Sequence, residues 1–317
     1  MKNKYLILKK KYLKLKYFYW TSSELLKTTI ARRNKIRVII NILIMQIKKN
    51  FSKKPFVFKT CTNTFAYTQK NIDTSGVAGL FYCGLMEANE ILCAWHLIRP
   101  NDIFFDIGAN QGAWGLILCA KKIYCHEFEP SSVTFQSLKK QISLNNDFND
   151  FLLPHKLAVS NKNGTIQFTV GRGQNNQIKS DFSVNTLKSS HESVKVATLD
   201  SLAEKYGYPT IIKIDTEGFT NEVLEKGIKV LNHKSLKALF IETFRKNVST
   251  TERFKEMEKL LANYGFFPYF FDISKRILTP ITKLNEGGQD TIYIRHNKEN
   301  LSLIKESKPL KIFNQYY

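Results

Sequence analysis

The sequence predicts an α/β fold: a doubly wound, mostly parallel sheet with an antiparallel edge strand and a basic helical N-terminal extension. Three observations support this. Short apolar runs alternate with segments of helical spacing, which is typical of a parallel sheet covered by helices on both faces. The last two strand-like runs have no helical pattern between them, which favours an antiparallel edge. The first 54 residues differ sharply in composition from the rest.

The elements before residue 150 are predicted from periodicity and end signals. Residues 55–69 read as two strands of a hairpin. Met86 to Ile98 has helical spacing and ends before Pro100. Ser131 or Ser132 is a suitable cap for the helix that follows the second apolar strand. Strands and helices then alternate, and they are expected at 102–108 (strand), 112–122 (helix), 123–130 (strand) and 131–146 (helix).

The elements after residue 150 continue this alternation. Asn163-Gly164 is a turn signal, and Gly265 closes the last long helix of the pattern. The polar residues after His296 are expected to be peripheral. Strands are expected at 152–160, 165–170, 193–198, 210–218, 236–244, 267–273 and 289–296, and helices at 199–207, 221–232 and 251–265.

The charge of the chain is concentrated at its N-terminus. The net charge is +21 over 317 residues, and residues 1–54 hold 16 Lys or Arg against the single acid Glu24. Such a segment favours anionic partners, of which a membrane surface or nucleic acid are examples. The apolar run Ile36 to Ile47 is too short for a membrane span, which needs about 20 residues. It is expected to pack on the body or to lie on a membrane surface.

We therefore divide the chain into an extension (1–54), a main domain (55–297) and a polar tail (298–317). Five cysteines are present, and none belongs to a CxxC pair, so no zinc or disulfide framework is predicted. No convincing targeting segment is seen. We expect a cytoplasmic protein, and peripheral association with an anionic membrane through residues 1–54 stays open beside a merely solvated arm.

The turn after the first apolar strand, "DIGANQG", carries the functional signal. A dinucleotide site has the spacing G-x-G-x-x-G, because its glycines let a pyrophosphate approach a helix N-terminus. Here the spacing is Asp106-x-Gly108-x-x-x-Gly112, and Asn110 fills the place of a required glycine. This disfavours a nucleotide-dependent oxidoreductase. An acid at the strand end suits a ligand with a cationic centre, such as the sulfonium and ammonium groups of S-adenosylmethionine.

Further acids fall at the predicted carboxyl ends of strands, where ligands bind in open parallel sheets. Glu129 ends the second strand and could accept hydrogen bonds from both hydroxyls of a ribose. Asp215 and Glu242 end two later strands. A metal held by Asp215, Glu217 and Glu242 is disfavoured, because no histidine joins them with ligand-like spacing. Lys213 is expected to be a strand residue that forms a salt bridge.

Seven short motifs occur in an order that resembles the FkbM family of S-adenosylmethionine-dependent methyltransferases. The resemblance covers about residues 80–295. It departs from the family at Phe219-Thr220, where the family usually continues with alanine and glutamate. The motifs are "GLME" (84–87), "DIGANQG" (106–112), "FEP" (128–130), "LN" (144–145), "AVS" (158–160), "TLD" (198–200) and "KIDTEG" (213–218).

The resemblance implies a Rossmann-like class I methyltransferase fold and O-methylation of a hydroxyl on a sugar, glycolipid or secondary metabolite. Asp215 is then expected to contact cofactor or acceptor, and Glu217 is a candidate base or, alternatively, a helix cap. The implied cofactor is S-adenosyl-L-methionine, and its expected contacts are Glu87, Asp106, Gly108, Ala109, Asn110, Gly112, Glu129, Ser160 and Asp215. No metal is expected, and a nucleic-acid acceptor is disfavoured.

One rival interpretation belongs to another functional class. The basic N-terminal segment could define a non-catalytic protein that binds a membrane surface or nucleic acid on a methyltransferase scaffold. Neither the identity of the acceptor nor the oligomeric state follows from the sequence.

Overall fold

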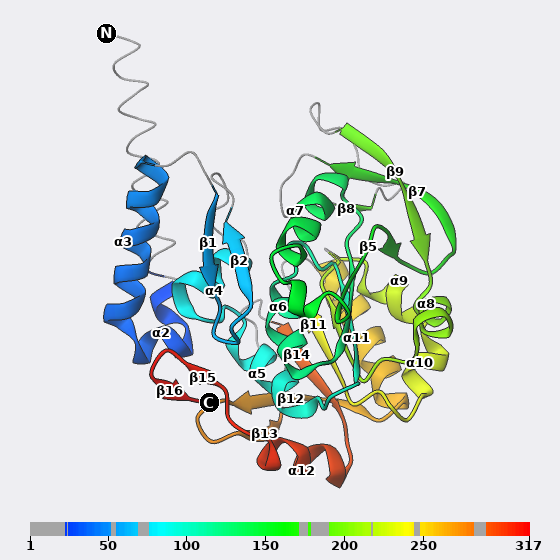
Figure 1. Cartoon of the computed structure of the whole chain (residues 1–317). Coiled ribbons are helices and arrows are strands. Elements are labelled where there is room, and N and C mark those ends of the chain that lie inside the picture. Colours follow the sequence, from blue (N-terminus) through cyan, green and yellow to red (C-terminus); the bar gives the residue numbers. More distant parts are fainter. Residues whose placement is uncertain are drawn as a thin grey trace.

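A central eight-stranded sheet organises the computed structural model of the chain (Figure 1). The residues that the structure describes are 23, 25–51, 55–68, 76–170, 177–178, 190–216, 218–243, 248–281 and 290–317. The strand order is β13-β12-β14-β11-β10-β3-β4-β5. These strands are β3 (Ile103–Ile107), β4 (Tyr124–Phe128), β5 (Leu152–His155), β10 (Ile211–Ile214), β11 (Ala238–Glu242), β12 (Phe266–Asp272), β13 (Ile277–Pro280) and β14 (Asp290–Arg295).

The directions of the strands confirm the predicted sheet. The neighbouring strands β5, β4, β3, β10 and β11 are all parallel. The antiparallel edge begins with β14, which runs against both β11 and β12, and the hairpin partner β13 extends it. The chain moves outward from β3 to β4 and β5 and then returns to β10 on the other side of β3. The strand order therefore reverses between β3 and β10, where an open α/β sheet binds its ligand.

Helices cover both faces of the sheet, because alternate strand residues point to opposite sides. Phe104, Ile211 and Phe240 belong to one buried core, and Phe105 and Ile212 belong to the other. The first core contains residues of α4 (Gly76–Cys83), α5 (Ala88–Leu97), α6 (Ala113–Leu118), α7 (Ser132–Ile142) and α12 (Lys298–Glu306). The second contains residues of α8 (Leu199–Tyr206), α9 (Thr220–Glu225), α10 (Ile228–Asn232) and α11 (Val248–Asn263).

Two elements differ from the sequence prediction. The expected strand at 152–160 divides, and β6 (Ala158–Val159) joins a second sheet instead of continuing β5. The expected helix at 221–232 breaks at Gly227. Asp200 explains this break, because its carboxylate accepts hydrogen bonds from the backbone N–H groups of Lys229 (3.1 Å) and Val230 (3.0 Å) and so caps a new helix, α10.

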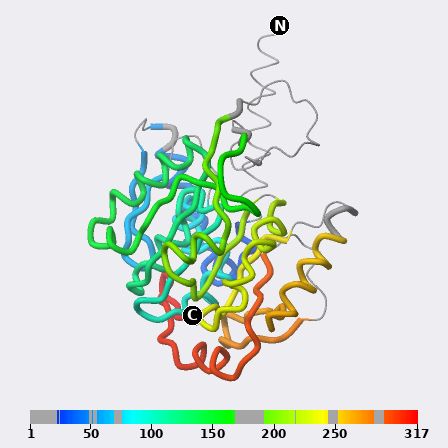
Figure 2. The backbone as a smooth tube through the Cα atoms, turned by 90° about the vertical axis from the view of Figure 1, so that its right-hand side faces the viewer, coloured from blue at the N-terminus to red at the C-terminus, as the bar shows by residue number. Residues whose placement is uncertain are grey.

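The second sheet has the order β6-β9-β7-β8, with β7 (Gly164–Val170), β8 (Gln177–Ile178) and β9 (Ser190–Ala197). In both views it lies at the end of the molecule opposite to α12 (Figures 1 and 2). Two short 3-10 helices, Cys119–Lys121 and Asn146–Phe148, complete the region of α6 and α7. The five cysteines are free thiols, and all except Cys61 are fully buried.

The two ends of the described chain pack on the same side of the main sheet. The N-terminal part forms α2 (Thr29–Arg33), α3 (Lys35–Phe51) and a hairpin of β1 (Phe56–Lys59) and β2 (Phe65–Thr68). The tail forms α12 and a hairpin of β15 (Lys311–Ile312) and β16 (Gln315–Tyr316). The tail is not peripheral, because Ile304, Ile312 and Tyr317 are buried in the core.

No single helix among the described residues is long and apolar enough to cross a membrane. Helices α4 and α5 together satisfy the length and composition test, but they are bent by 90° relative to each other.

Candidate active site

The loop between β3 and α6 forms the floor of the candidate site at the carboxyl edge of the sheet. The backbone N–H groups of Gly108 and Ala109 both donate to the carbonyl oxygen of Phe128, each at 3.0 Å. Gly112 donates to the carbonyl of Ala109 at 2.8 Å. Asn110 adopts a left-handed conformation with φ 53°, which asparagine tolerates better than most residues. The loop is therefore fixed against the ends of two neighbouring strands.

Gly108 is required by the close approach of a second strand end. Its φ is +83°, and a Cβ atom built at this position would lie 1.9 Å from the carbonyl oxygen of Asp215. At Gly112, with φ +76°, a Cβ would lie 2.6 Å from Leu138 Cδ1. Gly108 thus lets the β3–α6 loop meet the end of β10, and Gly112 lets the loop pack against α7, without a side chain between them.

Glu129 closes the other side of the loop, directly after β4. Its carboxylate accepts hydrogen bonds from the backbone N–H groups of Asn110 (3.0 Å) and Ser131 (2.8 Å). Burial raises the pKa of Glu129 to about 8, although these two hydrogen bonds oppose the shift. A carboxylate has about four acceptor positions, so Glu129 keeps acceptor capacity for hydroxyl donors of a ligand.

Three ionisable side chains form a row across the buried face of the sheet. Lys213 on β10 is the register partner of Asp106 on β3, which is the partner of Glu127 on β4. All three are buried. Glu127 lies beneath the first turn of α6, because a Cβ at Gly115 would be 1.9 Å from Glu127 Oε1. A row of one ammonium and two carboxyl groups is unusual in a core, since buried charges are costly unless paired.

The row shifts the proton affinities of its members. Burial raises the pKa of Asp106 to about 6, although the Lys213 ammonium opposes the shift. Burial and the nearby Asp106 raise the pKa of Glu127 well above its usual value. The interaction between the two carboxyls further raises the pKa of Glu127 and lowers that of Asp106, so that one proton is shared unequally between them. We therefore assign the proton to Glu127 and the negative charge to Asp106.

One oxygen of this charged carboxylate is unpaired. Asp106 Oδ1 has no hydrogen-bond partner, and Lys213 donates instead to Asp215 Oδ2 at 3.0 Å. The salt bridge expected for Lys213 is thus confirmed. Burial raises the pKa of Asp215, but Lys213 and a hydrogen bond with Glu242 outweigh burial, so the net shift is downward. Asp215 is ionised, and its side chain is 37% exposed.

More carboxyl groups surround this pair. Glu87, at the start of α5, accepts a hydrogen bond from Trp114 Nε1 at 2.5 Å. Asp290 begins β14 opposite Glu242, and burial raises its pKa well above the usual value. Burial also raises the pKa of Glu90 to about 7. Burial favours the neutral form of these raised groups, but Asp106 and Asp215 keep two negative charges beside the one ammonium of Lys213, so the site favours a ligand that brings positive charge.

The structure therefore brings together most of the residues expected at the site. Glu87, Asp106, Glu129, Asp215 and the loop from Gly108 to Gly112 all meet at the ends of β3, β4 and β10 or beside α6. Ser160 does not join them through any hydrogen bond. It follows β6, and its backbone N–H donates to Ala197 of the second sheet at 3.0 Å. Glu217 lies outside the described residues.

Other residues of the site were not identified from the sequence. Gln111 is buried in the loop, and its Oε1 atom has no partner. Its place inside the glycine motif was a usable signal. Glu127, Trp114 and Asp290 gave no such signal, because their role depends on which strands and helices become neighbours. His126 does not belong to the site: its Nδ1 lies 2.9 Å from His155 Nε2, on the opposite face of the sheet.

The described residues contain no candidate metal site, because no group of three or more His, Cys, Asp or Glu side chains among them is arranged to hold an ion. The geometry offers a glycine-containing loop at a strand-order reversal, with a buried carboxylate that has one unpaired oxygen before the loop and a second acceptor at its side. These features of an α/β protein fit a ligand that has a cationic part and hydroxyl groups.

Comparison with protein families identifies the class. The family model of the methyltransferase FkbM domain matches residues 106–268, which is just over half of the chain. The chain belongs to this methyltransferase family. None of the curated proteins matches the sequence.

Solved structures with related architecture are distant. One is described as methyltransferase FkbM from Methylobacillus flagellatus KT, with 13% identity and a TM-score of 0.43, and the match covers 87% of this chain. The chain spans 58% of the length of that protein. Another is described as precorrin-6y C5,15-methyltransferase from Geobacter metallireducens GS-15, with 9% identity, a TM-score of 0.35, and coverage of 65% of this chain and 86% of that one.

Proposed function

We propose that this FkbM-family methyltransferase uses S-adenosyl-L-methionine to methylate a hydroxyl group of a sugar, glycolipid or secondary metabolite. The observation that carries the proposal is the buried Asp106 carboxylate, whose Oδ1 has no hydrogen-bond partner, directly before the loop from Gly108 to Gly112. Leaving a buried acceptor unpaired costs about 1–3 kcal/mol. A ligand that supplies positive charge or a hydrogen-bond donor at this point recovers that cost, directly or through a water molecule.

The residues present fit this cofactor. When bound, the cofactor supplies an electrophilic methyl group on a sulfonium centre. Asp106 would hold its cationic methionine end, with Glu87 as a further carboxylate beside α6. Glu129 would accept hydrogen bonds from the ribose hydroxyls, since its two backbone donors leave acceptor positions free. Gly108 and Gly112 would fix the loop by their close contacts with Asp215 and Leu138, so that its backbone could lie against the cofactor at the start of α6.

Asp215 is best suited to orient the acceptor. Because its pKa is lowered, Asp215 is ionised at neutral pH but is a weak base, and an effective general base has a pKa near the working pH. Its exposed carboxylate would accept a hydrogen bond from the acceptor hydroxyl and hold the oxygen in line with the methyl group. Orientation of this kind can contribute about 7–11 kcal/mol. Proton removal is assigned to Glu217, as the motif order suggests.

Binding of the cofactor tests the first half of the proposal. Isothermal titration calorimetry should show saturable binding of S-adenosylmethionine to the folded full-length chain. Asp106→Asn and Glu129→Gln should each weaken binding by about tenfold to a hundredfold, which is the effect of about 1.4–2.8 kcal/mol. Glu204→Gln is the matched control, because Glu204 is an exposed acid on α8 that forms an ion pair with Lys229 of α10. Absence of binding to folded protein would overturn the proposal.

Methyl transfer tests the second half. The full-length enzyme, methyl-labelled cofactor and fractionated glycan, lipid and metabolite extracts should yield a labelled methyl ether, identified by mass spectrometry and NMR. Asp215→Asn should reduce the rate with little change in cofactor affinity, because this residue is assigned to the acceptor. Label found only on nitrogen, sulfur or carbon would refute O-methylation while leaving cofactor binding intact.

A further inference from the structure

Helix α3 has two apolar faces, and only one of them is covered. Its inner face packs on α4, where Val38, Ile42 and Met45 join Ala78 and Tyr82 in a separate buried cluster. The side-chain amide of Asn41 fixes this contact by donating to the carbonyl oxygens of Phe81 (2.9 Å) and Tyr82 (3.2 Å). These contacts determine which side of the helix faces outward.

The outer face is an exposed aliphatic stripe. The exposed fraction is 77% for Ile36, 53% for Leu43 and 58% for Ile47. At about 100° per residue, the stripe occupies roughly a third of the helix circumference, opposite to the buried face. An ordinary surface helix carries polar residues there. We define the α3 stripe as Ile36, Ile39, Ile40, Leu43, Ile47 and Phe51, all of which are exposed.

Positive charge borders the α3 stripe. Arg37 and Lys48 project between the inner and outer faces and are exposed, and Lys48 Nζ lies 4.2 Å from the ring centroid of Phe56. The sequence has no Asp or Glu from Leu25 to Ile72, and residues 1–22 add seven lysines without an acid. The stripe is thus an apolar surface within a region of one charge sign.

We propose that the α3 stripe docks on an anionic phospholipid membrane, with the helix lying in the plane of the interface. The aliphatic side chains would enter the boundary between headgroups and acyl chains, and the flanking cations would contact lipid phosphates. The helix has 17 residues and includes four Lys or Arg, so it is too short and too charged to span the bilayer. This inference goes beyond methyl transfer and does not depend on it.

Other occupants of the stripe are less consistent with its chemistry. A second copy of the chain would bring two basic regions together, and like charges repel. Nucleic acid would neutralise the cations, but its phosphates would leave the aliphatic centre of the stripe uncovered. A surface that combines anionic headgroups with hydrocarbon matches both parts.

Vesicle sedimentation with the full-length chain tests the proposal. Phosphatidylcholine vesicles that contain phosphatidylglycerol should bind the protein, and pure phosphatidylcholine vesicles should bind it much more weakly. The triple variant Ile36→Ser, Leu43→Ser, Ile47→Ser should lose about tenfold or more in vesicle affinity. It should keep its fold, because these side chains are exposed. Val133→Ser is the matched control, since Val133 is 76% exposed on α7.

The outcomes separate the alternatives. Unchanged vesicle binding by the triple variant, with binding lost on replacement of the lysines in residues 1–22, would overturn the proposal and assign binding to charge alone. Sedimentation velocity that shows a dimer, which the triple variant converts to monomer without a change in vesicle binding, would assign the stripe to self-association. The assay contains no cofactor, so its failure would leave the proposed methyl transfer untouched.

Discussion

The amino and carboxyl edges of the eight-stranded sheet differ in how their charged side chains are paired. At the amino edge, before β3 and β11, the cationic side chains are matched by acceptors. At the carboxyl edge, above β3 and β10, carboxyl groups outnumber cations and some of their oxygens have no partner. The same sheet therefore has one edge arranged for stability and one arranged for a ligand.

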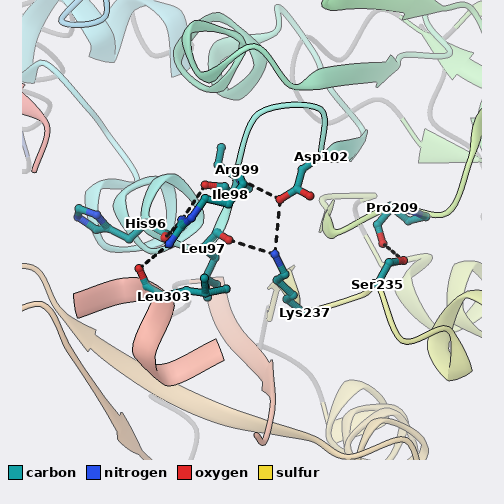
Figure 3. A network of polar contacts seen from close by, with 9 residues as sticks. All are labelled: His96, Leu97, Ile98, Arg99, Asp102, Pro209, Ser235, Lys237 and Leu303. Carbon is teal, nitrogen blue, oxygen red and sulfur yellow. Dashed lines mark hydrogen bonds and ion pairs between the residues drawn. The ribbon is translucent and has the colours of Figure 1, made fainter. Parts of the chain in front are cut away.

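Figure 3 shows the amino-edge network. Arg99 donates to the carbonyl oxygens of His96 (2.8 Å), Ile98 (2.9 Å) and Leu303 (3.0 Å), so it ties α12 to the end of α5. Asp102 accepts from the backbone N–H of Arg99 at 2.8 Å, and its carboxylate lies 3.5 Å from Lys237 Nζ. These contacts join β3, β11 and the tail at one place.

The carboxyl edge lacks this matching. Asp106 Oδ1, both carboxyl oxygens of Glu127 and Gln111 Oε1 have no hydrogen-bond partner. Unpaired buried acceptors reduce the free energy of unfolding. Their concentration beside the glycine loop indicates that part of the stability of the fold is given up for binding.

The largest expected effect comes from adding a side chain at Gly108. Gly108→Ala places a Cβ 1.9 Å from the Asp215 carbonyl at a positive φ. It should abolish cofactor binding and lower the free energy of unfolding by roughly 3–5 kcal/mol. Gly265→Ala is the control, because Gly265 has φ +80° with no atom within 4 Å of its Cβ position. Urea unfolding and calorimetry of both variants give the comparison, and equal losses would contradict the steric argument.

The amino edge should show the reverse pattern, with stability lost and binding kept. Arg295 donates to the carbonyl oxygens of Leu231 (2.6 Å), Leu236 (2.9 Å), His233 (3.0 Å) and Tyr264 (3.1 Å). Arg295→Ala should cost about 3 kcal/mol, since several carbonyls lose a charged donor. Thermal unfolding should show this loss.

The control and the readout of function complete the test of Arg295. Arg253→Ala removes only a surface ion pair with Glu222, which contributes at most about 1 kcal/mol. Cofactor affinity per folded molecule should be unchanged in both variants. A marked loss of affinity in Arg295→Ala would show that the two edges are coupled and not independent.

The protonated Glu127 gives the carboxyl edge a distinctive pH dependence. Its pKa is raised in the folded state, so the folded chain holds a proton that the unfolded chain releases above its ordinary pKa. The stability that this proton contributes is full below about pH 4.5 and is lost as the pH rises toward the folded pKa. Glu127→Gln removes the titration. Above about pH 5, and only as far as the raised pKa of Glu127 in the folded chain, the variant should gain up to about 1.4 kcal/mol per pH unit relative to the wild type.

Urea unfolding across this pH range measures the effect of Glu127→Gln. The difference between the two proteins is the quantity of interest, because buried histidines titrate in both. Burial lowers the pKa of His96 to about 3 and those of His126 and His155 to about 4, so their contribution falls at acidic pH in wild type and variant alike. A pH-independent difference would show that Glu127 is ionised in the folded chain.

The sequence predicts the carboxyl edge better than the amino edge. Asp106, Gly108 and Glu129 could be found because each directly follows or ends an apolar strand, and such strand ends meet at one edge whatever the rest of the chain does. Arg295 and Lys237 stabilise the opposite edge through carbonyls distant in sequence. No local pattern marks such contacts, and they become visible only with the strand order known.

The remaining differences have the same origin. Glu127 gave no sign of its burial, because an acid within a strand is normally expected on the solvent face, and its pairing with Asp106 depends on the register of two strands. Ser160 was expected at the site because it ends the motif "AVS". The order of the motifs along the chain does not show that β6, which precedes Ser160, pairs with the second sheet and not with the main sheet. The tail has polar composition overall, and only the spacing of Ile304, Ile312 and Tyr317 reflects its packing against the body.

The smallest expected effect is a proton released when the cofactor binds. In the free chain, burial raises the pKa of Asp106 to about 6 and that of Glu129 to about 8, so Glu129 is mostly protonated at pH 7. A cationic group near Asp106 and hydroxyl donors at Glu129 favour the ionised carboxylates and lower both pKa values. Binding at pH 7 should therefore release about one proton, and affinity should rise by at most about tenfold per pH unit up to pH 8.

Calorimetry in buffers of different ionisation enthalpy measures this proton release directly. The apparent binding enthalpy should depend on the buffer at pH 7 and much less at pH 9, where both carboxyls are already ionised. Glu129→Gln should remove most of the buffer dependence, while the exposed control Glu204→Gln should retain it. Proton uptake on binding would mean that the cofactor meets these carboxyls in their neutral form, and the carboxyl edge would then not act as an anionic site.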